Sequence, residues 1–159
     1  MHIREARRED AEAACEVLRR SIVELCRDDH EDDAPTLQLW LANKTPDHVL
    51  RWIGNAGTHM LVAEEAGAIL GVASLQAATG IVLLNYVSPD ARFRGVSRAL
   101  MAHVEAKARE LGLGALRLDS TGTARRFYRA MGFSDAGPPA PGFGRSKRHP
   151  MRKELAPTA

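Results

Sequence analysis

The sequence predicts a single α/β domain in which a mixed sheet carries helices on both faces. The 159 residues suit one domain with its own core. Hydrophobic residues make up 45% of the chain and charged residues 26%, which is ordinary for a globular protein. Segments with helical and strand periodicity follow in the order strand, helices, three strands, helix, strand, helix and strand.

The N-terminal part is predicted to contain one strand and three helical segments. Residues His2–Ala6 read as the strand, and Asp10 is the expected N-cap of a helix that continues to Cys26 with apolar residues at helical spacing. The run Asp28–Asp33 is acidic at every position except His30, and acids are disfavoured at the negative end of a helix dipole, so we expect a loop there. Two further helical segments follow, Thr36–Asn43 and Pro46–Gly54.

Turn signals divide the remainder of the chain into strands and helices. Ala66-Gly67 and Thr79-Gly80 separate three strands, of which the third is nearly all apolar and is predicted to be central. Gly112 and Gly132 each end a helix. The predicted strands are His59–Glu64, Ala68–Ala77, Ile81–Val87, Ala115–Asp119 and His149–Leu155, and the predicted helices are Gly95–Leu111 and Thr123–Met131.

Bulk properties exclude several classes of function. The formal net charge is only +2, so nothing calls for a nucleic acid or a membrane as partner. The N-terminus has no apolar signal region, and no apolar run approaches the roughly 20 residues that cross a bilayer, so a cytoplasmic location is expected. Cys15 and Cys26 fall about 16 Å apart on one predicted helix. They are expected to be core thiols, because a disulfide needs Cα atoms within about 7 Å.

The turn between the central strand and the long helix has the chemistry of a pyrophosphate site. Its basic loop leads into Gly95, where a helix begins whose first N–H groups have no intrahelical partner and carry partial positive charge. Ser97 and Ala99 are small, which permits close approach. Arg92, Arg94 and Arg98 add charge. On this chemistry alone, a basic helix start that binds nothing is an equal alternative.

Two segments resemble motifs of the GNAT superfamily of N-acetyltransferases. Val87-Ser88-Pro89 and Arg94-Gly95-Val96-Ser97-Arg98-Ala99 are similar to the acetyl-coenzyme A signature, with Ser97 where the family usually has glycine. Ala124 to Phe133 resembles the family's Ala-x-x-Phe-Tyr-x-x-x-Gly-Phe pattern, with Thr121 where asparagine is often found. The last strand also looks like that of the family, so the resemblance covers about residues 60–155.

The resemblance implies a single N-acetyltransferase domain over residues 1–159. It implies a mostly antiparallel sheet with a splayed central strand pair, in which the pantetheine arm of acetyl-coenzyme A lies. Backbone groups at Tyr86 and Val87 would contact the pantetheine, and amides from Arg94 to Ala99 would hold the pyrophosphate. The cofactor-binding residues expected from the resemblance are Tyr86, Val87, Arg92, Arg94, Gly95, Val96, Ser97, Arg98, Ala99, Thr121, Ala124 and Phe127.

The implied reaction is attack of a neutral amine on the thioester, which requires a base and a proton donor for the sulfur. Tyr128 falls on the family's tyrosine and is expected to be the general acid, since a phenol (pKa about 10) is protonated at pH 7; a core tyrosine is the alternative. The strand before the signature has no carboxylate, and Asn85 cannot take a proton. The base is left open among Asp28, Asp29, His30, Glu24, His149 and water.

The sequence also suggests roles for further residues, most of them with an alternative interpretation. The acidic run Asp28–Asp33 is either a lip that attracts a cationic amine or a solvated loop, and no metal site is expected there. His103 is expected to pack in the core. Trp40 and Trp52 are either core residues or walls of the acceptor site. The predicted function is transfer of an acetyl group to a primary amine of a small molecule or protein; the alternative is a non-catalytic acyl-coenzyme A sensor. A homodimer is left open.

Overall fold

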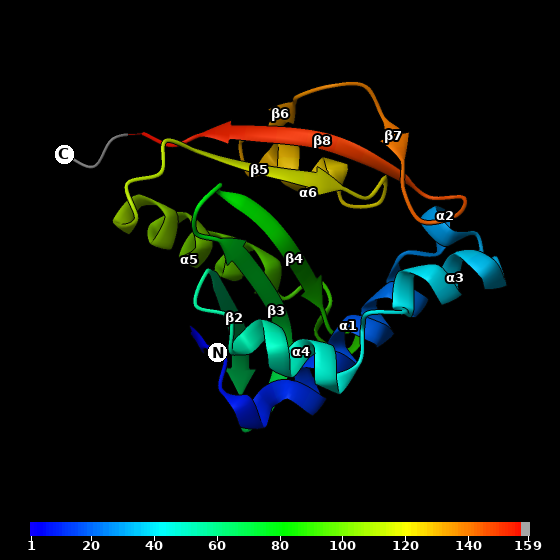
Figure 1. Cartoon of the computed structure of the whole chain (residues 1–159), viewed down its shortest axis with the longest axis horizontal. Helices are drawn as coiled ribbons and strands as arrows, with labels where there is room; N and C mark the ends of the chain where they lie inside the picture. Colours follow the sequence, from blue (N-terminus) through cyan, green and yellow to red (C-terminus); the bar gives the residue numbers. More distant parts are fainter. Residues whose placement is uncertain (157–159) are drawn as a thin grey trace.

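The structure, a computed structural model, describes residues 1–156 and contains an eight-stranded sheet with helices on both faces (Figure 1). The strands are β1 (His2–Glu5), β2 (Thr58–Glu65), β3 (Ala68–Gln76), β4 (Ile81–Val87), β5 (Ala115–Ser120), β6 (Ser134–Asp135), β7 (Ala140–Pro141) and β8 (Lys147–Glu154). The helices are α1 (Ala11–Leu25), α2 (Arg27–His30), α3 (Ala34–Leu41), α4 (Pro46–Ile53), α5 (Val96–Glu110) and α6 (Arg125–Ala130), with 3-10 turns at Arg8–Asp10 and Pro89–Ala91.

The strands lie in the order β1-β2-β3-β4-β5-β8-β6, and β7 pairs with β8. Every pairing is antiparallel except that of β4 with β5, which are parallel and are in register only at Ile81 and Arg117. Past this point the two strands diverge, as Figure 1 shows. The predicted mixed, mostly antiparallel sheet with a splayed central pair is therefore confirmed.

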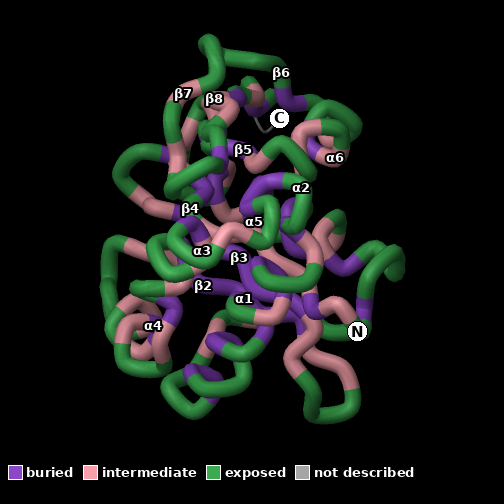
Figure 2. Tube along the Cα trace, turned by 90° about the vertical axis from the view of Figure 1, so that its right-hand side faces the viewer, coloured by how far each residue is buried: buried purple, intermediate pink, exposed green. Residues whose placement is uncertain are grey.

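Two layers of helices enclose the sheet. Helix α5 packs on β2, β3 and β4 from one side, while α1 and α4 cover the other side. The α5 layer buries Leu100, Met101 and Val104, and the α1 layer buries Ala14 and Leu18. Figure 2 shows the buried segments gathered along β2 and β3 and beneath α1, with the connecting loops exposed.

Two glycines fix the start of α5 against the sheet. A Cβ at Gly71 of β3 would lie 2.7 Å from Val96 Cγ1 and 2.9 Å from Leu100 Cδ1, so a side chain there would push the helix away. Gly95 is the N-cap residue and has φ of 77°, a left-handed conformation that side chains rarely adopt. The helix N-terminus is thereby held close to the end of β4.

Several sequence predictions are corrected by the structure. The run Asp28–Asp33 is not simply a loop, because Arg27–His30 form the short helix α2. The Asp10 side chain does not cap α1; its carboxylate accepts hydrogen bonds from the Arg4 guanidinium and the Arg7 amide instead. His103 is exposed rather than packed in the core. The short strands β6 and β7 lie in a region where no strand was predicted.

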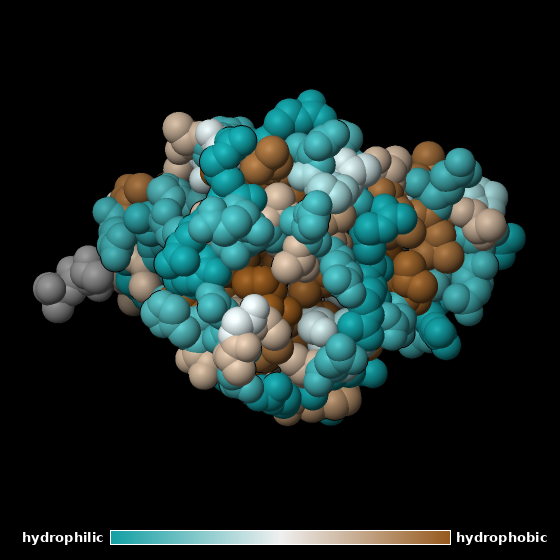
Figure 3. Space-filling model, turned by 90° about the horizontal axis from the view of Figure 1, so that it is seen from below, coloured by the Kyte–Doolittle hydropathy of each residue, from teal (hydrophilic) through white to brown (hydrophobic). Residues whose placement is uncertain are grey.

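The prediction of two core thiols is confirmed. Cys15 and Cys26 are both free and buried. Trp40 is buried at 4% exposure. Trp52 is half-buried and packs against the core beneath α1. Within residues 1–156, no helix combines the length and the hydropathy needed to cross a membrane. The face seen in Figure 3 shows apolar residues in its middle and near the end that carries α2 and α3, with hydrophilic residues around them.

Candidate active site

A cavity of about 490 Å³ opens where β4 and β5 diverge. It extends from the strand gap to the N-terminus of α5, so it joins the two places that the sequence motifs single out. Almost every residue expected to bind the cofactor lines it, together with Tyr128. The lining residues from that prediction are Tyr86, Val87, Arg92, Gly95, Val96, Ser97, Arg98, Thr121, Ala124, Phe127 and Tyr128.

Arg94 and Ala99 are the predicted residues that do not line the cavity. The Arg94 guanidinium donates to Glu65 Oε1 at 2.6 Å, which directs the side chain toward β2. The Ala99 amide donates to the Gly95 carbonyl oxygen at 3.0 Å and closes the first turn of α5. The amide donors proposed for the pyrophosphate are therefore those before Ala99.

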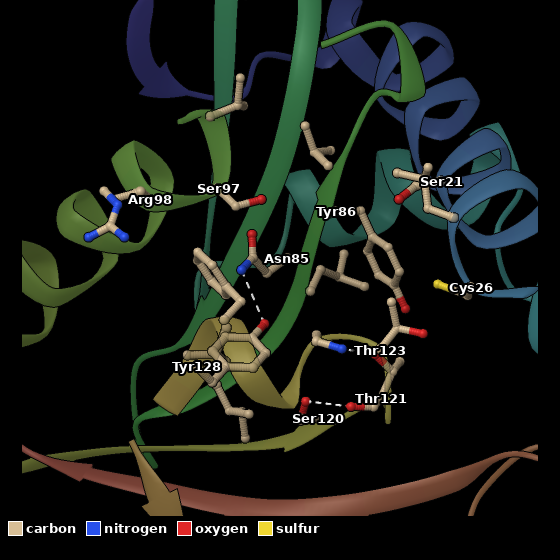
Figure 4. Close-up of a pocket in the computed structure, with 18 of the residues that line it drawn as sticks. Ser21, Cys26, Asn85, Tyr86, Ser97, Arg98, Ser120, Thr121, Thr123 and Tyr128 are labelled. Carbon is tan, nitrogen blue, oxygen red and sulfur yellow. Dashed lines mark hydrogen bonds between the residues drawn. The ribbon is translucent and has the colours of Figure 1, made fainter. Parts of the chain in front are cut away.

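The N-terminus of α5 presents amide donors to this cavity. Val96, Ser97 and Arg98 occupy the first helical turn, whose N–H groups have no carbonyl partner within the helix. Figure 4 shows the Ser97 hydroxyl directed toward the Asn85 side chain. Phe93, two residues before the N-cap Gly95, has φ of 63° and is 90% exposed, with the Arg92 guanidinium 4.5 Å from the centre of its ring. The turn thus offers partial and full positive charge to an anion.

Asn85 and Tyr128 form a polar pair inside the cavity (Figure 4). The Asn85 Nδ2 group donates to the Tyr128 hydroxyl at 3.1 Å. Burial raises the pKa of Tyr128 to about 12, so the phenol stays protonated at neutral pH. Asn85 Oδ1 is buried and has no hydrogen-bond partner among the described residues. Because a buried acceptor without a partner costs free energy, this oxygen is suited to accept from a bound ligand.

Tyr86 and the end of α1 form another wall. Figure 4 shows the hydroxyl end of Tyr86 on the side of Cys26, and both Cys26 and Ser21 also line the cavity. The Tyr86 hydroxyl accepts from the Trp40 indole N–H at 3.3 Å. Burial raises the pKa of both the Tyr86 phenol and the Cys26 thiol, so neither is ionised at neutral pH. The contribution of α1 was not predicted, because no local motif marks Ser21 or Cys26.

The loop after β5 is fixed by Asp29 from α2. The Asp29 carboxylate accepts from the Gly122 amide at 2.7 Å and from the Thr123 hydroxyl. The Thr121 hydroxyl in turn accepts from the Ala124 amide at 3.1 Å, which stabilises the turn that leads into α6. These contacts hold Thr121 and Ala124 at the cavity wall.

The side chains considered as general base lie elsewhere. None of Asp28, Asp29, His30, Glu24 and His149 lines this cavity. Asp29 binds the loop after β5, and His30 is fully buried, with its ring nitrogens at Val23 O and the Asp32 amide. The carboxylate that does line the cavity is Asp119, at the end of β5, and it accepts from Arg148 at 3.3 Å. Asp119 lies on the opposite face of β5 from the buried residues Leu118 and Ser120. The sequence shows this alternation of polar and buried positions, but the alternation alone does not mark Asp119 as a site residue.

A second cavity of about 630 Å³ adjoins the first. Both cavities are lined by Leu83, Leu84 and Tyr86 of β4 and by Asp119, Ser120 and Thr121 at the end of β5. The other walls of the second cavity come from Trp40, Lys44 and Trp52, and from the loop that holds Phe143. Trp40 and Trp52 therefore both pack against buried core residues and line this cavity. No group of three potential metal ligands occurs in residues 1–156.

Comparisons with known proteins agree with this geometry. The sequence pattern of the acetyltransferase (GNAT) domain matches residues 27–155. A protein of Azospirillum brasilense described as an IAA acetyltransferase is 32% identical over 99 residues, which span 58% of this chain and 65% of that protein.

Solved structures with the same fold cover nearly the whole chain. The GCN5-related N-acetyltransferase of Rhodopseudomonas palustris superposes with a TM-score of 0.85 at 24% identity, over 97% of this chain and 95% of that one. The PaiA N-acetyltransferase of Thermoplasma acidophilum, solved in complex with coenzyme A, gives a TM-score of 0.81 at 19% identity, over 96% and 98%. With the splayed strands and the helix N-terminus in place, and with the domain pattern matched over residues 27–155, the chain belongs to the GNAT acetyltransferase family.

Proposed function

We propose that this single domain transfers the acetyl group of acetyl-coenzyme A to the primary amine of an acceptor. The observation that carries the proposal is the cavity between β4 and β5, which leads from the amide donors of α5 to the Tyr128 hydroxyl. A solved structure with the same fold contains coenzyme A, which supports this choice of donor.

The donor is proposed to lie along the whole cavity. Its pyrophosphate would accept from the amides of Val96, Ser97 and Arg98, with the Arg98 guanidinium nearby. The pantetheine arm would follow β4, where Tyr86 and Val87 line the gap. The strand gap leaves the β4 backbone beyond Ile81 without a β5 partner, so those of its polar groups that face the gap rather than β3 are free to bind the pantetheine amides. Thr121, Ala124 and Phe127 complete the wall.

The proposed acetyl transfer follows from the side chains that line the cavity near the strand gap. The amine nitrogen attacks the thioester carbonyl and forms the C–N bond; the C–S bond then breaks, and the sulfur takes a proton. Because Tyr128 accepts its hydrogen bond from Asn85, the phenol hydrogen is free to be donated to the departing sulfur. The proton lost from nitrogen needs an acceptor, and we assign this role to Asp119, which lines both cavities.

The test is thiol release from acetyl-coenzyme A in the presence of a panel of primary amines. Turnover with at least one amine supports the acetyltransferase. The alternative, a sensor of acyl-coenzyme A without catalysis, is supported by the absence of a carboxylate in β4. Coenzyme A binding measured by calorimetry, together with no thiol release on any amine, would establish the sensor and reject the enzyme.

A further inference from the structure

The second cavity contains a buried lysine without a carboxylate partner. Lys44 is 5% exposed and lines the cavity between α3 and α4. Its ammonium donates to Asn43 Oδ1 at 2.7 Å, and no carboxylate of residues 1–156 lies within ion-pair distance of it. An ammonium has three hydrogens to donate, so hydrogen-bonding capacity remains.

This arrangement is unfavourable unless an anion binds. Removing a charge from water costs free energy that a partner of opposite charge offsets. Burial lowers the pKa of Lys44 to about 8, yet the group is still mostly protonated at pH 7. Asp119, the one carboxylate that lines this cavity, is already paired with Arg148 at 3.3 Å.

Four aromatic side chains form part of the lining. The rings of Trp40 and Phe143 stack with centroids 6.0 Å apart and planes inclined by 22°. The Lys44 ammonium lies 5.7 Å from the centre of the Phe143 ring. Trp52 and Tyr86 add further aromatic surface to the same cavity. Aromatic walls of this kind favour a ligand with a flat apolar body, whose polar groups would lie near Lys44 and near Asp119.

We propose that the amine acceptor carries a carboxylate, which the buried Lys44 binds, on an apolar aromatic body held between Trp52 and Phe143. This inference rests on the proposed function, since it places the acceptor in the cavity that shares its β4 and β5 walls with the donor cavity. The acceptor amine then points to Asp119 at the shared wall. Lys147 and Arg148 at the rim add positive charge, so a polycationic acceptor is disfavoured.

The test compares acceptors that differ only in the carboxylate. 4-(Aminomethyl)benzoate and 4-(aminomethyl)phenylacetate are each paired with the corresponding amide, and kcat/KM is measured by thiol release with saturating acetyl-coenzyme A. The intact protein should prefer at least one acid over its amide by about ten-fold or more, the discrimination expected for a charge-assisted hydrogen bond. Lys44→Met should remove this preference by lowering kcat/KM on the acid and leaving the amide within about two-fold.

Lys44→Arg, which keeps the charge, should retain part of the preference. Lys107→Met is the matched control, because Lys107 lies on α5 and lines neither cavity. Equal rates on acid and amide would overturn the inference, and so would an equal loss on both in Lys44→Met, which would place Lys44 in the chemistry. Quenching of tryptophan fluorescence by the acids alone, lost in Lys44→Met, would support the site even if no thiol were released. That result would reject only the proposed activity.

Discussion

Asn85 of β4 donates a hydrogen bond to the hydroxyl of Tyr128 in α6, and this bond spans the gap in the sheet over 3.1 Å. Because the phenol oxygen accepts this hydrogen bond, the hydroxyl hydrogen of Tyr128 remains available to be donated to a ligand. The same amide presents a buried oxygen without a partner. The pair thus offers one donor and one acceptor at the place where the strands separate, which is the arrangement that the aminolysis of a thioester needs.

Replacing Tyr128 by phenylalanine removes the donor and keeps the ring. We expect kcat to fall by about a hundred-fold, within the range for loss of a general acid, because the sulfur then leaves without a hydrogen bond. The dissociation constant of coenzyme A should stay within about three-fold, since binding and chemistry use different groups. Thiol release and calorimetry measure the two quantities. A variant with more than half of the original kcat would show that Tyr128 is only a packing residue.

Asp119→Asn tests the proton acceptor. The variant should lose about a hundred-fold in kcat/KM for the amine at pH 7, since an amide cannot take the proton. The loss should shrink as the pH approaches the pKa of the amine, because the amine then arrives deprotonated. Arg148→Met is the control for the ion pair with Asp119 and should lose less. Equal activity of Asp119→Asn and the original protein from pH 6 to pH 9 would contradict the assignment.

Ser97→Asp separates the stability of α5 from its capacity to bind an anion. A carboxylate in the first turn interacts favourably with the helix dipole, so the melting temperature should hold or rise slightly, by the equivalent of about 0.5 kcal/mol. The same charge repels a diphosphate, so the affinity for coenzyme A should fall by about ten-fold or more. Ser97→Ala, which is neutral and small, should stay close to the original affinity. Unchanged coenzyme A binding in Ser97→Asp would mean that the phosphates lie elsewhere.

Asp29→Asn tests whether Asp29 positions the loop after β5. The substitution removes a charged acceptor from the Gly122 amide and the Thr123 hydroxyl, at a cost of about 2 kcal/mol in the free energy of unfolding. KM for acetyl-coenzyme A should rise, because Thr121 and Ala124 lose their fixed place in the cavity wall. Urea denaturation measures the change in the free energy of unfolding, and steady-state kinetics measure the change in KM. A changed shape of the pH–rate profile would instead make Asp29 the base.

Lys44 should make stability depend on pH in a defined direction. Its folded-state pKa of about 8 lies below the unfolded value of 10.5, so the charged lysine destabilises the folded state below pH 8. This cost, about 3 kcal/mol, is relieved as the pH rises from 8 toward 10.5. Lys44→Met should therefore be more stable than the original protein at pH 7, with a difference that narrows by pH 10. Urea denaturation at pH 7 and at pH 10 measures this difference in stability. If Lys44→Met were less stable than the original protein at pH 7, the destabilising effect assigned to the buried charge would be contradicted.

The parts of the site that follow from local sequence were predictable. The turn into α5 and the Phe127-Tyr128 pair sit in short motifs whose conformation depends on neighbouring residues, and both line the cavity. Arg94 fits the same motif, but its partner Glu65 lies on β2, and no local rule reveals that ion pair. Ser21, Asp119 and Lys44 were missed as site residues for the same reason, since each reaches a cavity only through the packing of distant segments.

The errors in the fold have a related cause. His103 was expected inside because its neighbours are apolar, but the face of α5 that packs on the sheet carries Leu100, Val104 and Ala108, and His103 lies beside it. The acidic run was expected to avoid a helix on dipole grounds. That cost is small, and Asp29 finds amide and hydroxyl donors in the loop after β5 that offset it. Tertiary contacts override the local preference in both places.

One wall of the second cavity contains segments that the ribosome synthesises early and late. Thr36 of α3 accepts from the Arg145 amide at 3.0 Å, and Asp33 pairs with Arg145 at 3.4 Å. During synthesis, α3 emerges from the ribosome long before residue 145, so this wall closes only when nearly all of the described chain is out. The donor cavity, bounded mainly by residues between 82 and 128, also needs this late part of the chain, because Met151 of β8 is buried in one core cluster with Leu118 and Tyr128. A nascent chain would then bind neither coenzyme A nor an acceptor until β8 has emerged.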